Sequence, residues 1–278
     1  MRTKTVLIVL LALSSPFVSK PSHAVAPGVA GVASLVPGLG QAINGAPLEG
    51  LAWFSSILGG IILTGGNAYN QTIFFDLWMY NMYDAYRDAG AKRAAKQNLL
   101  VNYIASFNPL NVWGPPSTVP LAFNVAMALK PGRPKFALGP NSRFAPLLYM
   151  SFVSLGEEGL FRGFVFPGFT DIFFGSAIAG AVSSSLLFAA AHGLYSGQSS
   201  YAFQPYIFTF RTVGGLFWCW QNYRDNYDLR KSIFSHTWVD IVYEWDRQGM
   251  FGGGQVGSGG EKKLIKPNGL MLGYVFDI

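Results

Sequence analysis

Charged residues are scarce in this chain of 278 residues: Asp, Glu, Lys and Arg make up 12% of it, against about 25% in an ordinary soluble domain. Half of the residues are apolar, and the mean hydropathy is +0.29. This composition excludes a disordered chain and a coiled coil, because both carry many more charged residues. It predicts an all-α fold in the form of a polytopic transmembrane helical bundle.

Cysteine is nearly absent as well. Cys219 is the one cysteine, so neither an intrachain disulfide nor a cluster of thiolate metal ligands can form. No glycine-rich phosphate loop or dinucleotide fingerprint occurs, and no organic cofactor is expected. The tryptophans, Trp218 among them, are expected to pack or to lie at a membrane interface.

Basic residues outnumber acidic ones, with a net charge of +6, but this excess does not predict nucleic-acid binding. The basic residues lie in short stretches such as 92–96 and 130–135 instead of lining one face. Such stretches suit loops beside lipid headgroups. The expected partner is therefore a lipid bilayer.

The amino terminus has the pattern of a secretory signal peptide, residues 1–24. Residues 1–4 are basic, residues 5–18 are apolar, and Ser-His-Ala at residues 22–24 offers a cleavage site between small residues. An uncleaved anchor helix is the alternative. Both predict a protein of the membrane, of the bacterial cytoplasmic (inner) type.

Three further regions follow the predicted signal peptide. Residues 25–130 are predicted to hold a membrane hairpin, with an uncharged run at 51–66, and an amphipathic helix at the membrane surface at 72–96. Residues 131–246 form the predicted core, and residues 247–278 form a glycine-rich flexible tail.

Four apolar segments make up the predicted core, at about 144–166, 172–195, 203–220 and 232–245. The proline-rich stretch 108–120 before them is expected to break any helix. Ionisable residues inside transmembrane segments cost about 2.5–3.5 kcal/mol each on insertion scales, so each needs a partner or a task. The segments carry the following: Glu157, Glu158, Arg162, His192, Arg211, His236, Asp240 and Glu244.

The first segment holds two glutamates that the helical spacing separates. Residues four apart share a helix face, so Glu158 can pair with Arg162, whereas Glu157 is rotated by about 100° and has no obvious cation. A buried carboxylate without a counter-charge makes an effective general base. The spacing therefore predicts Glu157 as a base and Glu158 with Arg162 as its scaffold.

Both histidines of the predicted mature chain lie four residues from an aromatic or acidic partner. Phe188 precedes His192, and Asp240 follows His236. A single buried histidine is more often structural than catalytic, but two histidines beside an acid pair favour a catalytic site. Arg211 is expected to snorkel or to pair locally.

Three motifs occur in order on successive apolar segments. Residues 157–162 form an E-E-x-x-x-R motif, residues 188–192 form F-x-x-x-H, and residues 236–240 form H-x-x-x-D, where asparagine or aspartate closes the motif. In this order they resemble the CPBP family of intramembrane proteases, the CAAX-processing and bacteriocin-processing group that includes the Ras-converting endoprotease. The resemblance covers residues 144–245 and says nothing about residues 25–130.

The resemblance implies a helical bundle around a water-filled catalytic cavity. It implies hydrolysis of peptide bonds in membrane-associated peptides or proteins, with a prenylated CAAX substrate only by analogy with the family's eukaryotic members. By motif position it assigns a base, Glu157; a residue that holds or polarises the water, His192; residues that stabilise the oxyanion, His236 and Asp240; and supporting residues, Glu158, Arg162 and Phe188.

Position 240 puts one of these roles in question. An asparagine there would donate a hydrogen bond, whereas an ionised aspartate only accepts one. Asp240 either stays protonated, or it orients His236 and leaves the donating to the imidazole. We favour the second role, because a carboxylate commonly fixes a histidine tautomer.

Two alternatives remain open. Zinc could be held by Glu157, His192, His236 and Asp240, although no His-Glu-x-x-His helix is present, and otherwise no metal is expected. A non-catalytic membrane scaffold or immunity-type protein would keep the bundle and would tolerate Glu157→Gln.

Overall fold

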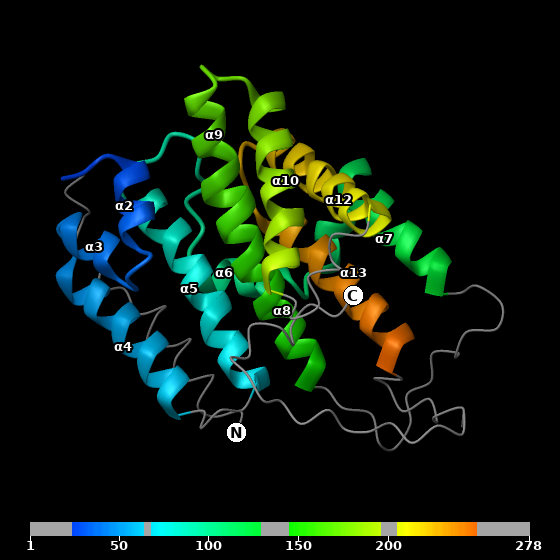
Figure 1. Ribbon diagram of the computed structural model, residues 1–278, viewed down its shortest axis with the longest axis horizontal. Helices are drawn as coiled ribbons and strands as arrows, with labels where there is room; N and C mark the ends of the chain where they lie inside the picture. The colour runs from blue at the N-terminus through cyan, green and yellow to red at the C-terminus, as the bar shows by residue number, and fades with distance from the viewer. Residues whose placement is uncertain (1–23, 64–67, 129–144, 196–204, 249–278) are drawn as a thin grey trace.

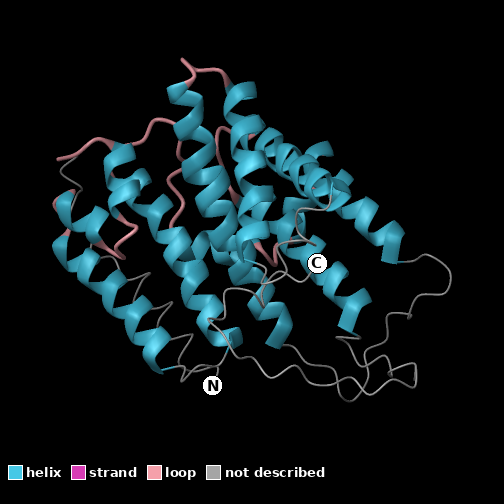
Figure 2. Cartoon of the chain, viewed as in Figure 1, coloured by secondary structure: helices cyan, strands magenta, loops and turns pink. Residues whose placement is uncertain are grey.

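The computed structural model describes residues 24–63, 68–128, 145–195 and 205–248, and every regular element in these ranges is a helix (Figure 2). The predicted all-α class is therefore confirmed for the described residues. In chain order the elements are α2 (Pro27–Ala33), α3 (Leu39–Ile43), α4 (Pro47–Leu63), α5 (Ala68–Asp88), α6 (Leu99–Ala105), the 3₁₀-helix η1 (Pro109–Val112), α7 (Pro115–Ala128), α8 (Ala145–Glu157), the π-helix η2 (Glu158–Val165), α9 (Phe166–Ile172), α10 (Ala177–Tyr195), α12 (Pro205–Arg224) and α13 (Arg230–Gln248).

A helical rod crosses the middle of the molecule (Figure 1). It consists of α8, η2 and α9, which follow one another without a gap. Helix α5 packs along α8 and η2, while α10 packs against η2 and α9, and α13 packs against α8. Helices α2 and α4 contact the other side of α5, so α5 lies between the N-terminal helices and the rod.

Two glycines let α5 approach the rod closely. A Cβ atom at Gly156 would lie 2.5 Å from the Asp76 carbonyl oxygen, and one at Gly163 would lie 2.4 Å from the Tyr83 ring. Real Cβ atoms do not come so near to other heavy atoms, because interiors are packed to van der Waals contact. Glycine at these positions therefore sets the spacing between α5 and the helix that carries the first motif.

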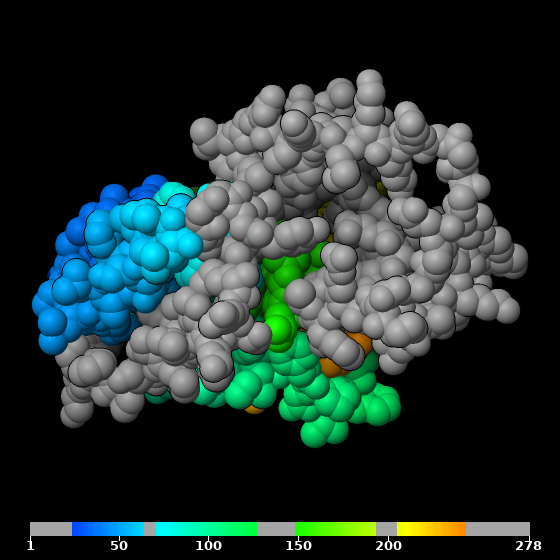
Figure 3. Space-filling model, turned by 90° about the horizontal axis from the view of Figure 1, so that it is seen from below, coloured from blue at the N-terminus to red at the C-terminus, as the bar shows by residue number. Residues whose placement is uncertain are grey.

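One hydrophobic core joins the N-terminal helices to the rod and to α13. Its buried members include Trp53, Ile57, Phe74, Leu77, Tyr80, Phe152, Leu155 and Ile233. Regions 25–130 and 131–246 were distinguished in the sequence, but they share this core. Figure 3 shows part of the rod in green, with the N-terminal helices in blue to cyan on one side and the blue-green segment around α6 and α7 on another.

The amphipathic surface helix predicted at 72–96 is wrong in its position. Helix α5 ends at Asp88 and is central to the fold. Asp76 and Asp84, two of its acidic residues, are 1% and 4% exposed. The N-terminal helices cover one side of α5, and the rod covers another.

The proline-rich stretch 108–120 does not prevent helix formation, contrary to expectation. It holds η1 and the first turns of α7. Pro115 and Pro116 open α7, where a missing N–H leaves no bond unmade. Pro120 lies inside α7, and the Asn124 side chain donates to its carbonyl oxygen at 2.9 Å.

The four predicted apolar segments correspond to α8 through α9, α10, α12 and α13. In the described ranges, none of these or the other helices combines the length and the hydropathy that a bilayer crossing requires. The predicted signal peptide, apart from Ala24, and the predicted tail from residue 249 lie outside the described residues.

Candidate active site

The acid pair of the first motif lies where the helical geometry of the rod changes. Glu157 ends α8 and Glu158 begins η2, whose π-helical turns are a form found often at functional sites. Arg162 Nη1 lies 3.2 Å from Glu158 Oε1, and both side chains are fully buried. The ion pair predicted from the four-residue spacing is therefore present.

Glu157 lies between the two histidines. Its Oε1 is 3.8 Å from His192 Nε2, its Oε2 is 3.5 Å from His236 Nε2, and the side chains of all three residues are at most 5% exposed. Glu157 Oε2 has no hydrogen-bond partner among the described residues. Helices α8, α10 and α13 thus bring the three motifs together around one carboxylate.

His192 has a defined tautomer. Its Nδ1 lies 2.7 Å from the Phe188 carbonyl oxygen, one helical turn earlier in α10. A carbonyl oxygen only accepts, so Nδ1 carries the proton in this bond and Nε2 presents its lone pair when the ring is neutral. The four-residue spacing of Phe188 and His192 therefore directs Nε2 toward Glu157.

His236 faces carboxylates with both ring nitrogens. Its Nδ1 is 2.8 Å from Glu158 Oε1, and its Nε2 is 3.5 Å from both Glu157 Oε2 and Asp240 Oδ2. The preferred role of Asp240 needs correction on this point, because Glu158 makes the short bond that orients the ring. Nδ1 makes the short bond, and Nε2 lies within ion-pair distance of two further carboxylates.

Aromatic side chains form the wall around these charges. Trp218 stacks on the His236 ring, with centroids 4.1 Å apart and planes at 21°. The Arg162 guanidinium lies 4.2 Å from the Phe188 ring centroid and 5.0 Å from that of Trp218, so two aromatic rings enclose the cation of the ion pair. Trp218, which was expected to pack or to lie at a membrane interface, packs inside the site.

Two charged residues near the site come from outside the three motifs. Arg211 of α12 is 5% exposed, so it is buried and does not snorkel. Its charge acts on His192 and Asp240. Asp76 of α5 is 1% exposed and is repelled by Glu157 and Asp240. The sequence signal for Asp76 was an aspartate on the face of a helix whose other residues are mostly apolar or aromatic.

The donor set considered for zinc does not converge on one point. Across the described part of the chain, the group of three acidic or histidine residues whose ligand atoms all lie within 4.8 Å is Glu49, Asp84 and Asp88. We call these residues with Arg87 the α4–α5 cluster. Burial, followed by repulsion from Asp84 and Asp88, raises the pKa of Glu49 to about 8. The zinc alternative stays a prediction without a converged ligand set.

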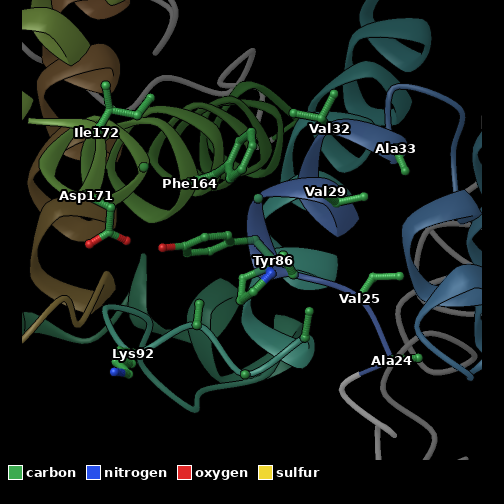
Figure 4. Close-up of a pocket in the computed structure, with 17 residues that line it drawn as sticks. Ala24, Val25, Val29, Val32, Ala33, Tyr86, Lys92, Phe164, Asp171 and Ile172 are labelled. Atoms are coloured by element: carbon green, nitrogen blue, oxygen red, sulfur yellow. The ribbon is translucent and has the colours of Figure 1, made fainter.

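A cavity of about 1390 Å³ lies elsewhere, among α2, the end of α5 and the η2–α9 part of the rod (Figure 4). Val29, Val32 and Phe164 give it a largely apolar lining, and the Tyr86 hydroxyl points toward Asp171. None of the motif residues that form the site lines this cavity. The water-filled cavity expected around Glu157 stays a prediction.

Residues 140–242 match a protein-family model described as Rce1-like: Type II CAAX prenyl endopeptidase Rce1-like. The matched segment contains all three motifs and the rod. The match confirms the resemblance of this segment to the CAAX and CPBP proteases. That family is membrane-embedded and implies protease activity. Searches of curated proteins and of solved structures gave no match.

Proposed function

We propose that this CAAX-protease-like chain is an intramembrane endopeptidase that cleaves membrane-associated peptides or proteins with water activated by Glu157. The observation that carries the proposal is the Glu157 carboxylate, buried between His192 Nε2 at 3.8 Å and His236 Nε2 at 3.5 Å. The family match supports the reaction class.

Glu157 acts as the general base. It takes a proton from water while the water oxygen forms a bond to the scissile carbonyl carbon, and a tetrahedral oxyanion results. The same proton then passes to the amine nitrogen as the C–N bond breaks. Proton transfer by a positioned side chain of this kind contributes typically about 10²–10⁴-fold in rate.

His236 stabilises the oxyanion. Glu158 holds its Nδ1 at 2.8 Å and Trp218 stacks on its ring, so the direction of Nε2 is fixed before substrate binds. Loss of one donor aimed at an oxyanion costs about 10²–10³ in kcat in a well-studied protease. Asp240, 3.5 Å from the same Nε2, balances the charge of the ring in the resting state.

The Glu158–Arg162 ion pair holds His236 and the base Glu157 in position without touching the reacting atoms. The pair is fully buried, and Arg162 is enclosed by Phe188 and Trp218. His192, with its Nδ1 bound to the Phe188 carbonyl, directs Nε2 toward the water that Glu157 deprotonates.

The family description points to a substrate whose C-terminal residues follow an isoprenylated cysteine. We propose a test with purified protein in lipid vesicles and a peptide ending in an isoprenylated cysteine plus three residues, with products identified by mass spectrometry. Wild type is expected to release the C-terminal tripeptide, and Glu157→Gln is expected to abolish release at equal protein content.

Peptide mapping of membranes from cells that carry wild type or Glu157→Ala extends the test to other membrane-associated substrates. Full turnover by Glu157→Gln would exclude the glutamate mechanism. Absence of turnover by wild type on every probe would favour a scaffold or immunity-type protein. Loss of turnover with a strong chelator and its return with zinc would favour the metal alternative.

A further inference from the structure

Asp76 is a buried carboxylate without a hydrogen-bond partner in the described part of the chain, and it comes from a region that the family match does not include. It lies in the middle of α5 and is 1% exposed. Neither carboxylate oxygen has a hydrogen-bond partner among the described residues. Burial of a carboxylate without pairing is unfavourable, so a fold that keeps one there needs a reason beyond stability.

The surroundings of Asp76 belong to the site. Glu157 and Asp240 are the charged groups that act most strongly on it, and both repel it. Its backbone touches α8 at the residue that precedes Glu157, because a Cβ atom at Gly156 would lie 2.5 Å from the Asp76 carbonyl oxygen and 2.7 Å from its Cβ. This close approach of α5 to the rod therefore brings Asp76 near the residue that precedes the proposed base.

Asp84, two turns along the same helix, shows what a structural carboxylate in α5 has around it. Its Oδ2 accepts from Trp53 Nε1 at 3.1 Å and from Gln41 Nε2 at 3.3 Å, and its Oδ1 pairs with Arg87 at 2.5 Å. Asp76 has no such donors in the described structure. Its acceptor oxygens are therefore available to a ligand with hydrogens to donate.

We propose that Asp76 is a second catalytic carboxylate, which binds the attacking water together with Glu157. This inference rests on the proposed function. Water has two hydrogens, and Glu157 Oε2 and Asp76 are open acceptors for them. Such a pair would fix the direction of the water lone pair toward the scissile carbonyl carbon.

The reaction balances with Asp76 as an acceptor only. One water hydrogen passes to Glu157 as a proton while the water oxygen bonds to the carbonyl carbon, and that proton later leaves with the amine. The other hydrogen stays on the oxygen and keeps its hydrogen bond to Asp76. Asp76 therefore contacts a reacting atom without changing its own protonation.

Activity and stability together test this role. Asp76→Ala is expected to lower kcat on the isoprenylated peptide by about 10²-fold, within the range for a positioned catalytic group, with KM unchanged. Asp76→Asn keeps an acceptor oxygen and is expected to lose less, about tenfold. Both variants should have melting temperatures equal to or above that of wild type, because they remove a buried carboxyl group that has no hydrogen-bond partner in the described structure.

Asp84→Asn is the matched control on the same helix. It removes a paired charge, so its melting temperature is expected to fall while kcat stays within twofold of wild type. Asp76 variants that keep wild-type kcat, or that lose kcat and stability together, or that fail to fold, would overturn the inference.

Glu157→Gln, measured alongside, separates this inference from the proposed function. Loss of turnover in Glu157→Gln with wild-type turnover in Asp76→Ala would overturn the role of Asp76 alone. Turnover by Glu157→Gln, or none by wild type, would overturn the proposed function and the role of Asp76 with it.

Discussion

Two groups of buried or half-buried carboxylates differ in what surrounds their charges. In the α4–α5 cluster, Arg87 contacts both Asp84 and Asp88, at 2.5 Å and 2.7 Å, and neutral donors from Trp53 and Gln41 complete Asp84. These contacts tie the N-terminal helices to α5. The charges of this cluster are used for packing.

At the α8–η2 junction the pairing is incomplete. Glu158 Oε1 has Arg162 and His236 as partners, whereas Glu158 Oε2, Glu157 Oε2 and both oxygens of Asp76 have no hydrogen bond within the described residues. Asp84, which has donors for both of its oxygens, therefore differs from Glu157 and Asp76, which keep open acceptor oxygens where we propose the chemistry. Active sites commonly depart from the rules that stabilise the rest of a protein.

Removal of Arg162 is expected to have the largest effect on stability. Arg162→Met leaves the Glu158 charge buried with only His236 beside it, and breaking one side of a buried pair typically costs about 3–5 kcal/mol. Thermal and denaturant unfolding of the purified protein measures the loss. The double variant Glu158→Gln/Arg162→Met should recover part of it, and an equal loss in both would contradict the pairing.

Gly156→Ala breaks the contact that brings α5 to the site. The added methyl group meets backbone and Cβ atoms of Asp76 at 2.5–2.7 Å, and overpacking typically costs about 1–3 kcal/mol. Turnover should fall as well, because Asp76 and Glu157 move apart. Gly168→Ala on the same rod has no atom within 4 Å of its Cβ and serves as the control. Equal melting temperatures of the two variants would contradict this packing.

The smallest expected effect is a pH dependence of the stability of the fold, which arises from the α4–α5 cluster. The pKa of Glu49 rises from its ordinary value of 4.5 to about 8 in the fold, because of burial and the neighbouring aspartates. The folded state then binds the proton more tightly, so this contribution to stability is complete below pH 4.5 and is lost as the pH rises through about 8.

Glu49→Gln should remove that dependence. The melting temperature of wild type is expected to fall more steeply between pH 5.5 and pH 8.5 than that of Glu49→Gln. Parallel curves for the two proteins would show that Glu49 is not held in the acidic cluster as described.

The sequence predicted which side chains of the site lie together better than how the helices pack around them. Motif spacing identified Glu157, His192 and His236 because a turn of helix fixes which side chains of one segment share a face. It also identified the Glu158–Arg162 pair, although η2 is π-helical. These inferences depend on local spacing.

Contacts between helices distant in sequence could not be predicted in this way. The pattern of α5 predicted a surface helix because it does not show which helices cover it, so the burial of Asp76 could not be predicted. Glu158, not Asp240, makes the short bond to His236, because the approach of α13 to the rod decides which carboxylate reaches Nδ1. The stacking of Trp218 on His236 likewise depends on how α12 packs.

The most direct test of the account is turnover by Glu157→Gln in vesicles, compared with wild type at equal protein content and with melting temperatures measured for both. We predict at least about a 10²-fold loss of kcat, as for other positioned proton-transfer groups, with an unchanged or higher melting temperature. Turnover within a few-fold of wild type would contradict the claim that this carboxylate activates water.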